Sequence, residues 1–299
     1  MFPLMQIPTG SVPIERPCLY LVATPIGNLA DITLRALSIL AGSDLLLAED
    51  TRVTRKLLDH YGIEGGVSAL HDHNEREIAG RLVARIAHEN LAVALVSDAG
   101  TPLVSDPGYA LVQAALAAGI PVRAAPGASA VLAALCVSGL PSDRFSFEGF
   151  LPPKAQAARA LLATLAEEPR TLIFFESPRR VGRTLALLRE IMGAGRLVAV
   201  ARELTKLHET VYRGSACEVA DAVAADSFGA TGEFVIAVAP APPRAPDSAG
   251  IGALLKALAP HLPRSQAVEV TSACLGCPRN EAYRVALELD VDFARTGLG

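Results

Sequence analysis

Three short turns, rich in glycine, proline and small polar residues, each follow an apolar, strand-like run. They are residues 24–28 (TPIGN), 98–102 (DAGTP) and 126–129 (PGAS). In open α/β sheets, ligands bind beyond the carboxyl ends of the strands. Small residues at these turns let a ligand approach the backbone, and Asp98 offers a carboxylate to a ribose or an amine. Ordinary turn formation explains any one of them. For the three together, a cofactor cleft is as good an interpretation as ordinary turns.

The glycine spacing restricts which cofactor fits. The first turn holds one glycine instead of the G-x-G-x-x-G pattern of dinucleotide-binding proteins. Asp50 does follow this turn at about the sequence separation at which those proteins carry the acidic residue that binds the ribose. The chain has no G-K-[ST] sequence, which excludes ATP binding through a P-loop. A neutral or zwitterionic nucleoside therefore suits these turns better than a pyrophosphate.

The elements that must position the turns alternate between strands and helices, which is typical of an α/β fold with a largely parallel, buried sheet. The first set of predicted strands covers residues 19–23, 44–48, 67–70, 91–97 and 122–125. A second set covers 171–175, 197–202, 210–213 and 233–239, and some antiparallel pairing is expected there. The tail reads as three short helices.

Composition changes place the boundaries between these parts. The predicted parts are a tail (1–17), an N-terminal α/β domain (18–139), a linker (140–153), a C-terminal α/β domain (154–240), a flexible linker (241–250) and a helical tail (251–299). At about 150 residues per domain, a chain of 299 residues is also expected to form two domains.

The composition indicates a folded protein, because 51% of the residues are hydrophobic and 19% are charged. The sequence shows no apolar run long enough to cross a membrane and no signal peptide, so we expect a soluble, cytoplasmic protein. With 27 basic and 31 acidic residues the net charge is −4, which argues against non-specific coating of nucleic acid. Binding to a polyanion would need a local basic patch.

The five cysteines predict reduced thiols and no metal site. Only Cys274 and Cys277 form a C-x-x-C pair, and no second pair of ligands follows at zinc-binding spacing. Gly276 and Pro278 instead suggest the end of one helix and the start of the next.

Several segments together resemble a family of small-subunit ribosomal RNA methyltransferases in the tetrapyrrole methylase superfamily. The most specific are SDAGTPLVSDPG at 97–108 and TPIGNLAD at 24–31. The others are LAEDTR (47–52), HDHNE (71–75), LPSDRFSFEGFLP (140–152), RTLIFFES (170–177), ARELTK (201–206) and RNEAYRVA (279–286). The resemblance runs from about residue 18 to 240 and extends into the tail.

The resemblance implies two α/β domains of the tetrapyrrole methylase type with S-adenosylmethionine in the cleft between them, and a small C-terminal helical extension. It also implies 2′-O-methylation of a cytidine in the decoding region of small-subunit (16S) ribosomal RNA, by a homodimer. The cofactor-binding residues that it implies are Pro25, Ile26, Gly27, Asp98, Gly100, Thr101, Ser129, Ala130, Phe175, Ala201 and Gly232.

The sequence departs from the family pattern at three positions. Val53 stands where histidine is expected, Ala128 where proline is commoner, and Thr231 where lysine is frequent. The changes at 53 and 231 each remove a group that could face RNA, so they bear on substrate binding more than on the reaction.

Methyl transfer to a ribose 2′-oxygen is helped by a base or by a cation that stabilises the oxyanion. Candidates at or just beyond strand ends are Glu49, Glu176, Glu203 and Lys206, with Asp50 beside the first. Carboxylates at such positions are more often caps or ion-pair partners than bases. We assign no base from the sequence.

Because the net charge is −4, RNA binding would need local basic clusters, and the sequence contains two candidates. Such clusters are usually solvated faces. Arg52, Arg55 and Lys56 form the first, and Arg179 and Arg180 belong to the second. His71 and His73 are predicted to contact RNA or a partner subunit, or to be merely solvated. With no tryptophan and 5% aromatic residues, base stacking is expected to contribute little.

Two other functions remain open on the sequence: methylation of a small tetrapyrrole, and a ribosome-associated binding role without catalysis. The HDHNE and ARELTK segments favour the RNA enzyme over the first alternative. The three intact turns argue against the second.

Overall fold

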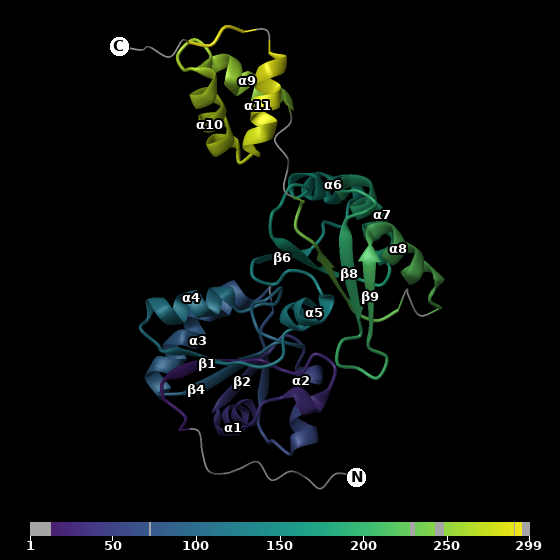
Figure 1. The fold of residues 1–299 in the computed structure, drawn as a ribbon. Coiled ribbons are helices and arrows are strands. Elements are labelled where there is room, and N and C mark those ends of the chain that lie inside the picture. Colours follow the sequence, from purple (N-terminus) through teal and green to yellow (C-terminus); the bar gives the residue numbers. More distant parts are fainter. Residues whose placement is uncertain (1–12, 72, 228–230, 243–247, 290, 295–299) are drawn as a thin grey trace. The chain divides into compact units, whose positions relative to one another are not determined.

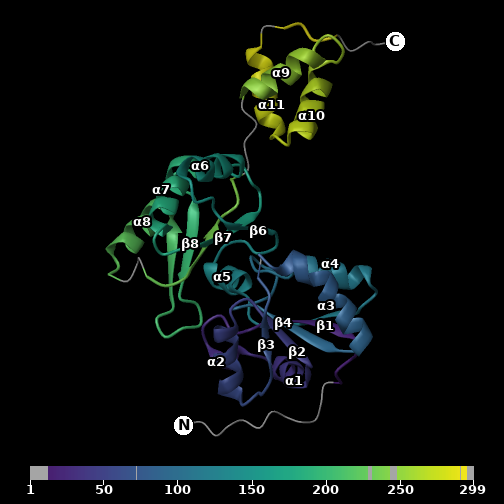
Figure 2. The ribbon, with the colours of Figure 1, turned by 180° about the vertical axis from the view of Figure 1, so that it is seen from behind.

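The computed structural model describes residues 13–71, 73–227, 231–242, 248–289 and 291–294. The chain divides into two compact units, Met1–Pro240 and Ala241–Gly299. The first unit contains two five-stranded sheets with their helices, and the described residues of the second form helices and no strand (Figures 1 and 2). The α/β class and the helical extension are as predicted.

The first sheet is entirely parallel, in the order β3-β2-β4-β1-β5. Its strands are β1 (Cys18–Val22), β2 (Leu45–Ala48), β3 (Val67–Ala69), β4 (Ala92–Val96) and β5 (Val122–Ala125). Alternate residues of β1 face opposite sides, as the period of a strand requires. Tyr20 packs with α1 (Leu34–Gly42) and α2 (Thr51–Tyr61), whereas Leu19 packs with α3 (Glu75–Glu89) and α4 (Tyr109–Ala117).

The second sheet is mixed, in the order β6-β7-β10-β8-β9. Its strands are β6 (Phe145–Phe150), β7 (Thr171–Glu176), β8 (Leu197–Arg202), β9 (Thr210–Ser215) and β10 (Phe234–Val238). β10 runs antiparallel to both β7 and β8, and β8 antiparallel to β9, which confirms the expected antiparallel pairing. The prediction that residues 140–153 form a linker was wrong, because this segment contains β6, which pairs in parallel with β7.

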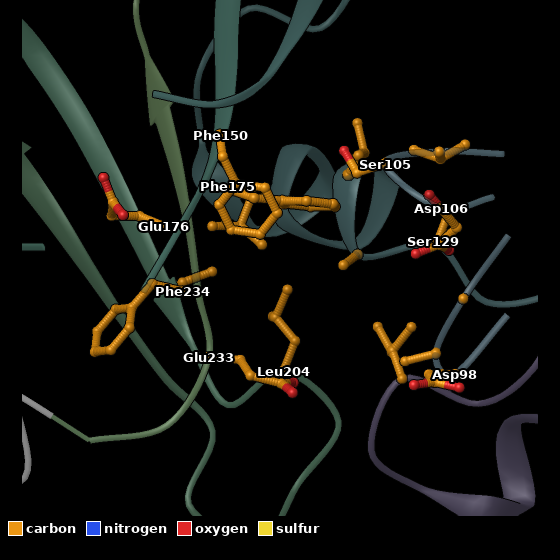
Figure 3. A pocket seen from close by; sticks show the side chains of 18 of the residues that line it. Asp98, Ser105, Asp106, Ser129, Phe150, Phe175, Glu176, Leu204, Glu233 and Phe234 are labelled. Atoms are coloured by element: carbon orange, nitrogen blue, oxygen red, sulfur yellow. The ribbon is translucent and has the colours of Figure 1, made fainter. Parts of the chain in front are cut away.

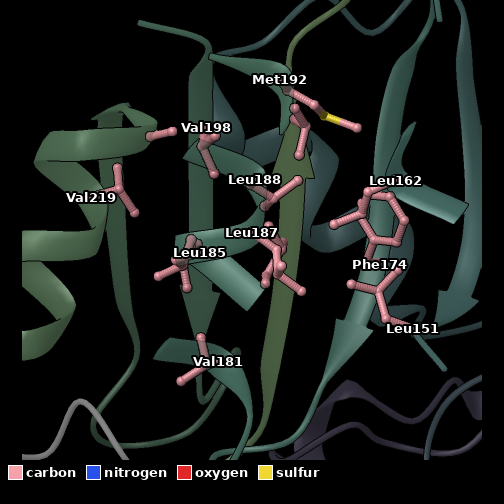
Figure 4. Close-up of a cluster of buried hydrophobic side chains, with 14 of the residues drawn as sticks. Leu151, Leu162, Phe174, Val181, Leu185, Leu187, Leu188, Met192, Val198 and Val219 are labelled. Atoms are coloured by element: carbon pink, nitrogen blue, oxygen red, sulfur yellow. The ribbon is translucent and has the colours of Figure 1, made fainter. Parts of the chain in front are cut away.

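The two faces of the second sheet carry different cores. One packs against α6 (Ala155–Thr164), α7 (Val181–Met192) and α8 (Ala216–Ala225), where Phe174 and Leu185 are fully buried (Figure 4). The other packs against α5 (Ala130–Ser138), which follows the last strand of the first sheet. Ile26 and Leu204 join this second core, so α5 and these two side chains fix one sheet against the other.

The second unit has its own core. Its helices are α9 (Ser248–Leu258), α10 (Arg264–Leu275) and α11 (Arg279–Glu288), and Ile251, Val268 and Ala286 are buried between them. α9 begins three residues before the predicted start at 251, and residues 243–247 of the predicted flexible linker lie outside the described part. In the described part of the chain, no helix is long and apolar enough to cross a membrane.

Candidate cofactor and RNA site

Hydrogen bonds join the first two predicted turns directly. Thr24 and Gly100 form an isolated antiparallel bridge, in which each backbone N–H donates to the other's carbonyl at 2.8 and 3.1 Å. The Thr24 hydroxyl donates to the Ser97 carbonyl, and the Ser97 hydroxyl donates to the Gly100 carbonyl, both at 3.1 Å. These partners are buried, so the two turns hold one fixed geometry. Gly100 has φ +86°, which glycine adopts most readily.

The third turn is tied to the second by a side chain. The Thr101 hydroxyl donates to the carbonyl of Ala128 at 3.2 Å. One residue later, Ser129 caps α5 by accepting a hydrogen bond from the Leu132 N–H. Because Ala128 contributes its backbone carbonyl here, its departure from proline leaves the link between these turns in place.

A cavity of about 440 Å³ opens beside these turns, between them and the α5-facing side of the second sheet (Figure 3). Most of the predicted cofactor residues line it: Ile26, Asp98, Gly100, Thr101, Ser129, Ala130, Phe175, Ala201 and Gly232. Pro25 and Gly27 line an adjoining cavity instead. We call these the first and the second cavity.

Every titratable residue that lines the first cavity in the described part of the chain is acidic. They are Glu49, Asp98, Asp106, Glu176 and Glu233. Asp98 is half-buried, and its Oδ1 accepts a hydrogen bond from the Asp50 N–H at 2.9 Å. Apolar side chains such as Ile26, Phe175 and Leu204 supply much of the remaining wall. This wall combines a surface for a flat apolar ring with carboxylates for a cation.

Glu176, one of the predicted catalytic candidates, is directed away from the middle of the cavity (Figure 3). Its carboxylate is 1% exposed and accepts hydrogen bonds from the Arg180 Nε at 2.7 Å and the Thr184 hydroxyl at 2.6 Å. Arg180 also donates to the Leu151 carbonyl at 3.1 Å. Glu176 and Arg180 therefore secure the start of α7, and the Arg180 side chain is 22% exposed and engaged within the protein.

Glu203, Lys206 and Glu233 form an ionic cluster where the loop after β8 meets the first turn. The Lys206 Nζ lies 2.7 Å from Glu203 Oε1 and 3.1 Å from Glu233 Oε2. Burial lowers the pKa of the Lys206 ammonium, but the hydrogen bonds to both carboxylates outweigh burial and raise it above its ordinary value. Burial raises the pKa of Glu203, but the hydrogen bonds from Lys206 and from the Glu233 N–H leave it lowered. Lys206 is therefore a fixed cation.

Glu49 and Asp50 follow the end of β2 but differ in their surroundings. Glu49 is exposed and lines the first cavity. Asp50 caps α2 by accepting from the Arg52 N–H at 2.9 Å, and its carboxylate pairs with the Arg52 side chain. The hydrogen bonds from the Arg52 side chain and backbone lower the pKa of Asp50 to about 2.

The remaining RNA candidates fall into engaged and available groups. Arg52 pairs with Asp50, and the Arg55 Nη1 donates to the Gly65 carbonyl at 2.8 Å. Lys56 is exposed and lines the second cavity, and Arg179 is exposed at the start of the turn before α7. His73 is exposed beside the partly buried His71, with ring centroids 5.9 Å apart.

Two of the positions that depart from the family pattern lie near this region. Val53 lines the second cavity, whereas Thr231 is exposed next to Gly232.

The sequence reasoning missed several lining residues. Ser105 and Asp106 belong to the SDPG end of the long motif at 97–108, which the turn argument stopped short of. Phe150 was missed because its strand was taken for a linker. Its ring lies 5.5 Å from that of Phe175 and it is 54% exposed, so the first cavity has an aromatic wall that the low aromatic content did not suggest.

The described residues contain no group of three or more histidine, cysteine or acidic side chains placed to hold a metal ion. All five cysteines are free, with Cys277 buried in the core of the second unit and Cys274 exposed.

Comparison with known proteins yields two family matches. The family described as Tetrapyrrole (Corrin/Porphyrin) Methylases matches residues 18–220, and the RsmI C-terminal HTH domain matches residues 245–290. Ribosomal RNA small subunit methyltransferase I of Mesorhizobium japonicum is 50% identical over 277 residues, covering 93% of each chain. The protein of the same name from Xylella fastidiosa (strain Temecula1) is 51% identical, covering 89% of this chain and 97% of its own.

Solved structures support the fold. The uroporphyrin-III-C-methyltransferase from Thermus thermophilus superposes with a TM-score of 0.53 at 24% identity, covering 75% of this chain and 94% of that one. Diphthine synthase superposes with a TM-score of 0.55 at 17% identity, covering 74% of this chain and 90% of its own.

Proposed function

The chain belongs to the tetrapyrrole methylase family, in the branch of ribosomal RNA small subunit methyltransferase I, and on this premise we propose its reaction. It transfers a methyl group from S-adenosylmethionine to the ribose 2′-oxygen of a cytidine in small-subunit (16S) ribosomal RNA. The observation that carries this proposal is about 50% identity over some nine tenths of the chain to enzymes of that name.

The first cavity suits S-adenosylmethionine in size and in charge. Its volume of about 440 Å³ lies in the usual range for a small-molecule site. The cofactor carries a positive sulfonium and a positive amino group. The described titratable residues of the lining are all carboxylic acids, and of these Glu176 is paired with Arg180 and Glu233 with Lys206, so the charge match rests on the others. Phe175 and Ile26 offer apolar surface for the adenine, and Asp98 offers a carboxylate to the ribose or the amino group. When bound, the cofactor supplies a methyl group activated by the sulfonium.

The chain's own residues orient the reactants and stabilise charge. The fixed turns hold the cofactor in one place, so alignment of the ribose oxygen supplies much of the rate. Lys206 keeps its proton at neutral pH, and it stabilises the negative charge that develops on that oxygen. Because Glu176 is engaged with Arg180 and Thr184, we do not assign it the role of base.

RNA contacts are assigned to the side chains that remain available. Lys56, Arg179 and His73 are exposed on the unit that contains both cavities, and they position the RNA through its phosphates. This substrate also places the protein in the cytoplasm. The exposed apolar side chains Tyr109, Leu116 and Leu132 on α4 and α5 support the homodimer that the family resemblance implies.

The test is transfer of tritiated methyl groups from S-adenosylmethionine to undermethylated 30S subunits, beside a free tetrapyrrole as the competing acceptor. We expect labelling of the RNA alone. Labelling of the tetrapyrrole, or cofactor binding without any transfer, would support instead the two alternatives that the sequence left open.

Two variants of Asp98 relate the reaction to the first cavity. Asp98→Asn retains an oxygen that accepts from the Asp50 N–H but loses the charge, whereas Asp98→Ala loses both. Loss of one hydrogen bond to a charged group corresponds to about 1.5–3 kcal/mol, roughly 10- to 150-fold in affinity. We expect Asp98→Asn to weaken cofactor binding by that factor and Asp98→Ala by at least as much. Unchanged affinity in both would remove Asp98 from the cofactor site.

A further inference from the structure

The second cavity adjoins the first and has a different set of charges. It has a volume of about 370 Å³ and shares Ile26, Asp98, Ala99 and Glu233 with the first cavity. Lys56 and Lys206 line only the second cavity, whereas no lysine, arginine or histidine is among the described residues that line the first. The carboxylates of the second cavity, Asp98 and Glu233, therefore belong to the wall between the two.

We propose that the second cavity binds the ribose and the adjoining phosphate of the target nucleotide, with Lys56 contacting the phosphate. The proposal rests on the proposed function and places its acceptor site. The two ligands then meet at the shared wall, as methyl transfer requires, because reacting atoms must approach to roughly 3–3.5 Å. A cationic donor on the acidic side and a phosphate on the lysine side also match the two cavities in charge.

Lys56 is the cation best placed to take a phosphate. It is exposed on α2, and the described part of the chain offers its ammonium no ion pair. The neighbouring Arg52 and Arg55 are also exposed, but they contact Asp50 and the Gly65 carbonyl, and neither lines the second cavity. A lysine reaches a phosphate as a mobile point charge, and such contacts position nucleic acid without reading its sequence.

Lys206 packs against the first turn and is rigidly placed. A Cβ atom added at Gly27 would stand 2.5 Å from its Cγ, so its stem packs directly against that turn. Glu203 and Glu233 hold its ammonium and compensate much of its charge, which leaves Lys56 as the main attraction for the phosphate. Lys206 instead presents a fixed hydrogen-bond donor beside the shared wall.

Thr54 gives an independent sign that the second cavity takes a polar ligand. It lines the cavity and is 2% exposed, and its hydroxyl has no hydrogen-bond partner in the described part of the chain. A buried hydroxyl without a partner destabilises the folded protein. The hydroxyl oxygen is shielded from solvent, so a ribose hydroxyl or phosphate oxygen of RNA would supply the partner once binding shifts the side chains that cover it.

The first test measures binding of undermethylated 30S subunits at several salt concentrations for wild type, Lys56→Gln and Lys154→Gln. Lys154 is an exposed lysine at the start of α6 that lines neither cavity, so it controls for the loss of one charge. For Lys56→Gln we expect binding several-fold weaker and a slope of log affinity against log salt that is smaller by roughly 0.7–0.9. Affinity for S-adenosylmethionine should not change, and Lys154→Gln should match wild type.

The second test compares Thr54→Val with Thr54→Ser. Valine keeps the shape and removes the unpaired hydroxyl, so the melting temperature should not fall, while kcat/KM for the subunit should fall by roughly threefold to tenfold, the value of one hydrogen bond. Serine keeps the hydroxyl, so Thr54→Ser should retain the wild-type kcat/KM.

The outcomes separate this proposal from the reaction itself. Wild-type transfer to 30S subunits with both Lys56→Gln and Thr54→Val behaving as wild type would overturn the acceptor site and leave the reaction standing. Weaker cofactor binding in either variant would assign the second cavity to the cofactor and also overturn it. Absence of transfer by the wild type would overturn both proposals.

Discussion

Phe175 and Glu176 are neighbours on β7, yet the structure gives them opposite surroundings. Alternate residues of a strand point to opposite faces. Ile173 and Phe175 face α5, and Phe175 also lines the first cavity. Phe174 and the Glu176 carboxylate face the helices on the other side, where Arg180 and Thr184 hold the carboxylate. Strand parity therefore separates a cofactor candidate from an ion-pair residue, and applying it along β7 would have removed Glu176 from the catalytic candidates.

Tyr212 provides a residue-scale prediction on the pH dependence of stability. It lies on β9, and its hydroxyl donates to the Asp226 carboxylate. Burial, together with this hydrogen bond, raises the pKa of Tyr212 to about 12 from its ordinary value of 10.0. The folded state therefore favours the protonated phenol. Its stabilisation is complete below pH 10 and is lost as the pH rises from 10 toward 12, because the unfolded chain releases the proton first.

The matching variant is Tyr212→Phe. We expect it to lower the free energy of unfolding by about 1 kcal/mol at pH 9, the value of one hydrogen bond, and by less at pH 11. Urea unfolding of both proteins at these two pH values measures the difference. A difference that stays constant or grows with pH contradicts the assigned role of the phenol.

At the scale of elements, the sequence predicts the strands and helices of both sheets well where their patterns are local. The bounds of β5 and β8 agree with prediction. β6 was missed because its sequence, FSFEGF, contains a glycine and follows a proline-containing stretch, and its alternation is interrupted by a register shift between Phe147 and Phe150. Gly149 in this bulge has φ +67°. A bulge of this kind is set by pairing with β7, which no local pattern records.

The site was predictable to the extent that it is made of loops at strand ends. Three turns, found from small residues and spacing alone, are joined by hydrogen bonds in the structure. What the sequence does not contain is the packing of α5 from the first sheet onto the second. That long-range contact forms the opposite wall of the first cavity and brings Lys206 to Gly27. Local sequence patterns therefore do not place the second-sheet residues at this site.

Gly27 supports a prediction about how closely these two elements approach. A Cβ there would lie 2.5 Å from Lys206 Cγ and 3.0 Å from the Leu204 carbonyl oxygen, which is backbone and cannot move aside by rotation. We expect Gly27→Ala to displace the loop after β8, to lower kcat/KM at least tenfold and to destabilise the fold by about 1–3 kcal/mol. Kinetic assays and urea unfolding measure the two effects.

Gly182 is the matched control for this substitution. It lies in α7, and an added Cβ would meet nothing within 4 Å. Gly182→Ala should stabilise the protein by about 0.5–1 kcal/mol, because alanine is the better helix former, and should leave catalysis unchanged. If Gly27→Ala and Gly182→Ala give the same kcat/KM and the same stability, the close approach at Gly27 does not matter for function.

At the scale of the whole molecule, the two units have separate cores and carry matches to separate families. Both cavities belong to residues 1–240. The second unit exposes Lys256, Arg264 and Arg279 on its helices, and basic side chains there suit phosphate contacts. We propose that the first unit carries the chemistry and that these side chains of the second unit add contacts to RNA.

Removal of the second unit tests this division. A chain ending at residue 240 should bind S-adenosylmethionine with the affinity of the full chain, because it retains every residue that lines the first cavity. Its affinity for 30S subunits should fall by at least tenfold, as expected when several phosphate contacts are lost. Calorimetry and a filter-binding assay measure the two affinities. Equal subunit affinity in the two proteins would mean that the second unit does not contribute to RNA binding.

The most direct test of the reaction is the position of the methyl group on the RNA. After transfer from labelled S-adenosylmethionine to undermethylated 30S subunits, the ribosomal RNA is isolated and hydrolysed in alkali, which cleaves only next to a free 2′-hydroxyl. We predict that the label appears in a single alkali-resistant dinucleotide that begins with 2′-O-methylcytidine. Label released as an ordinary mononucleotide would place the methyl group on a base, and that result would contradict ribose methylation by this protein.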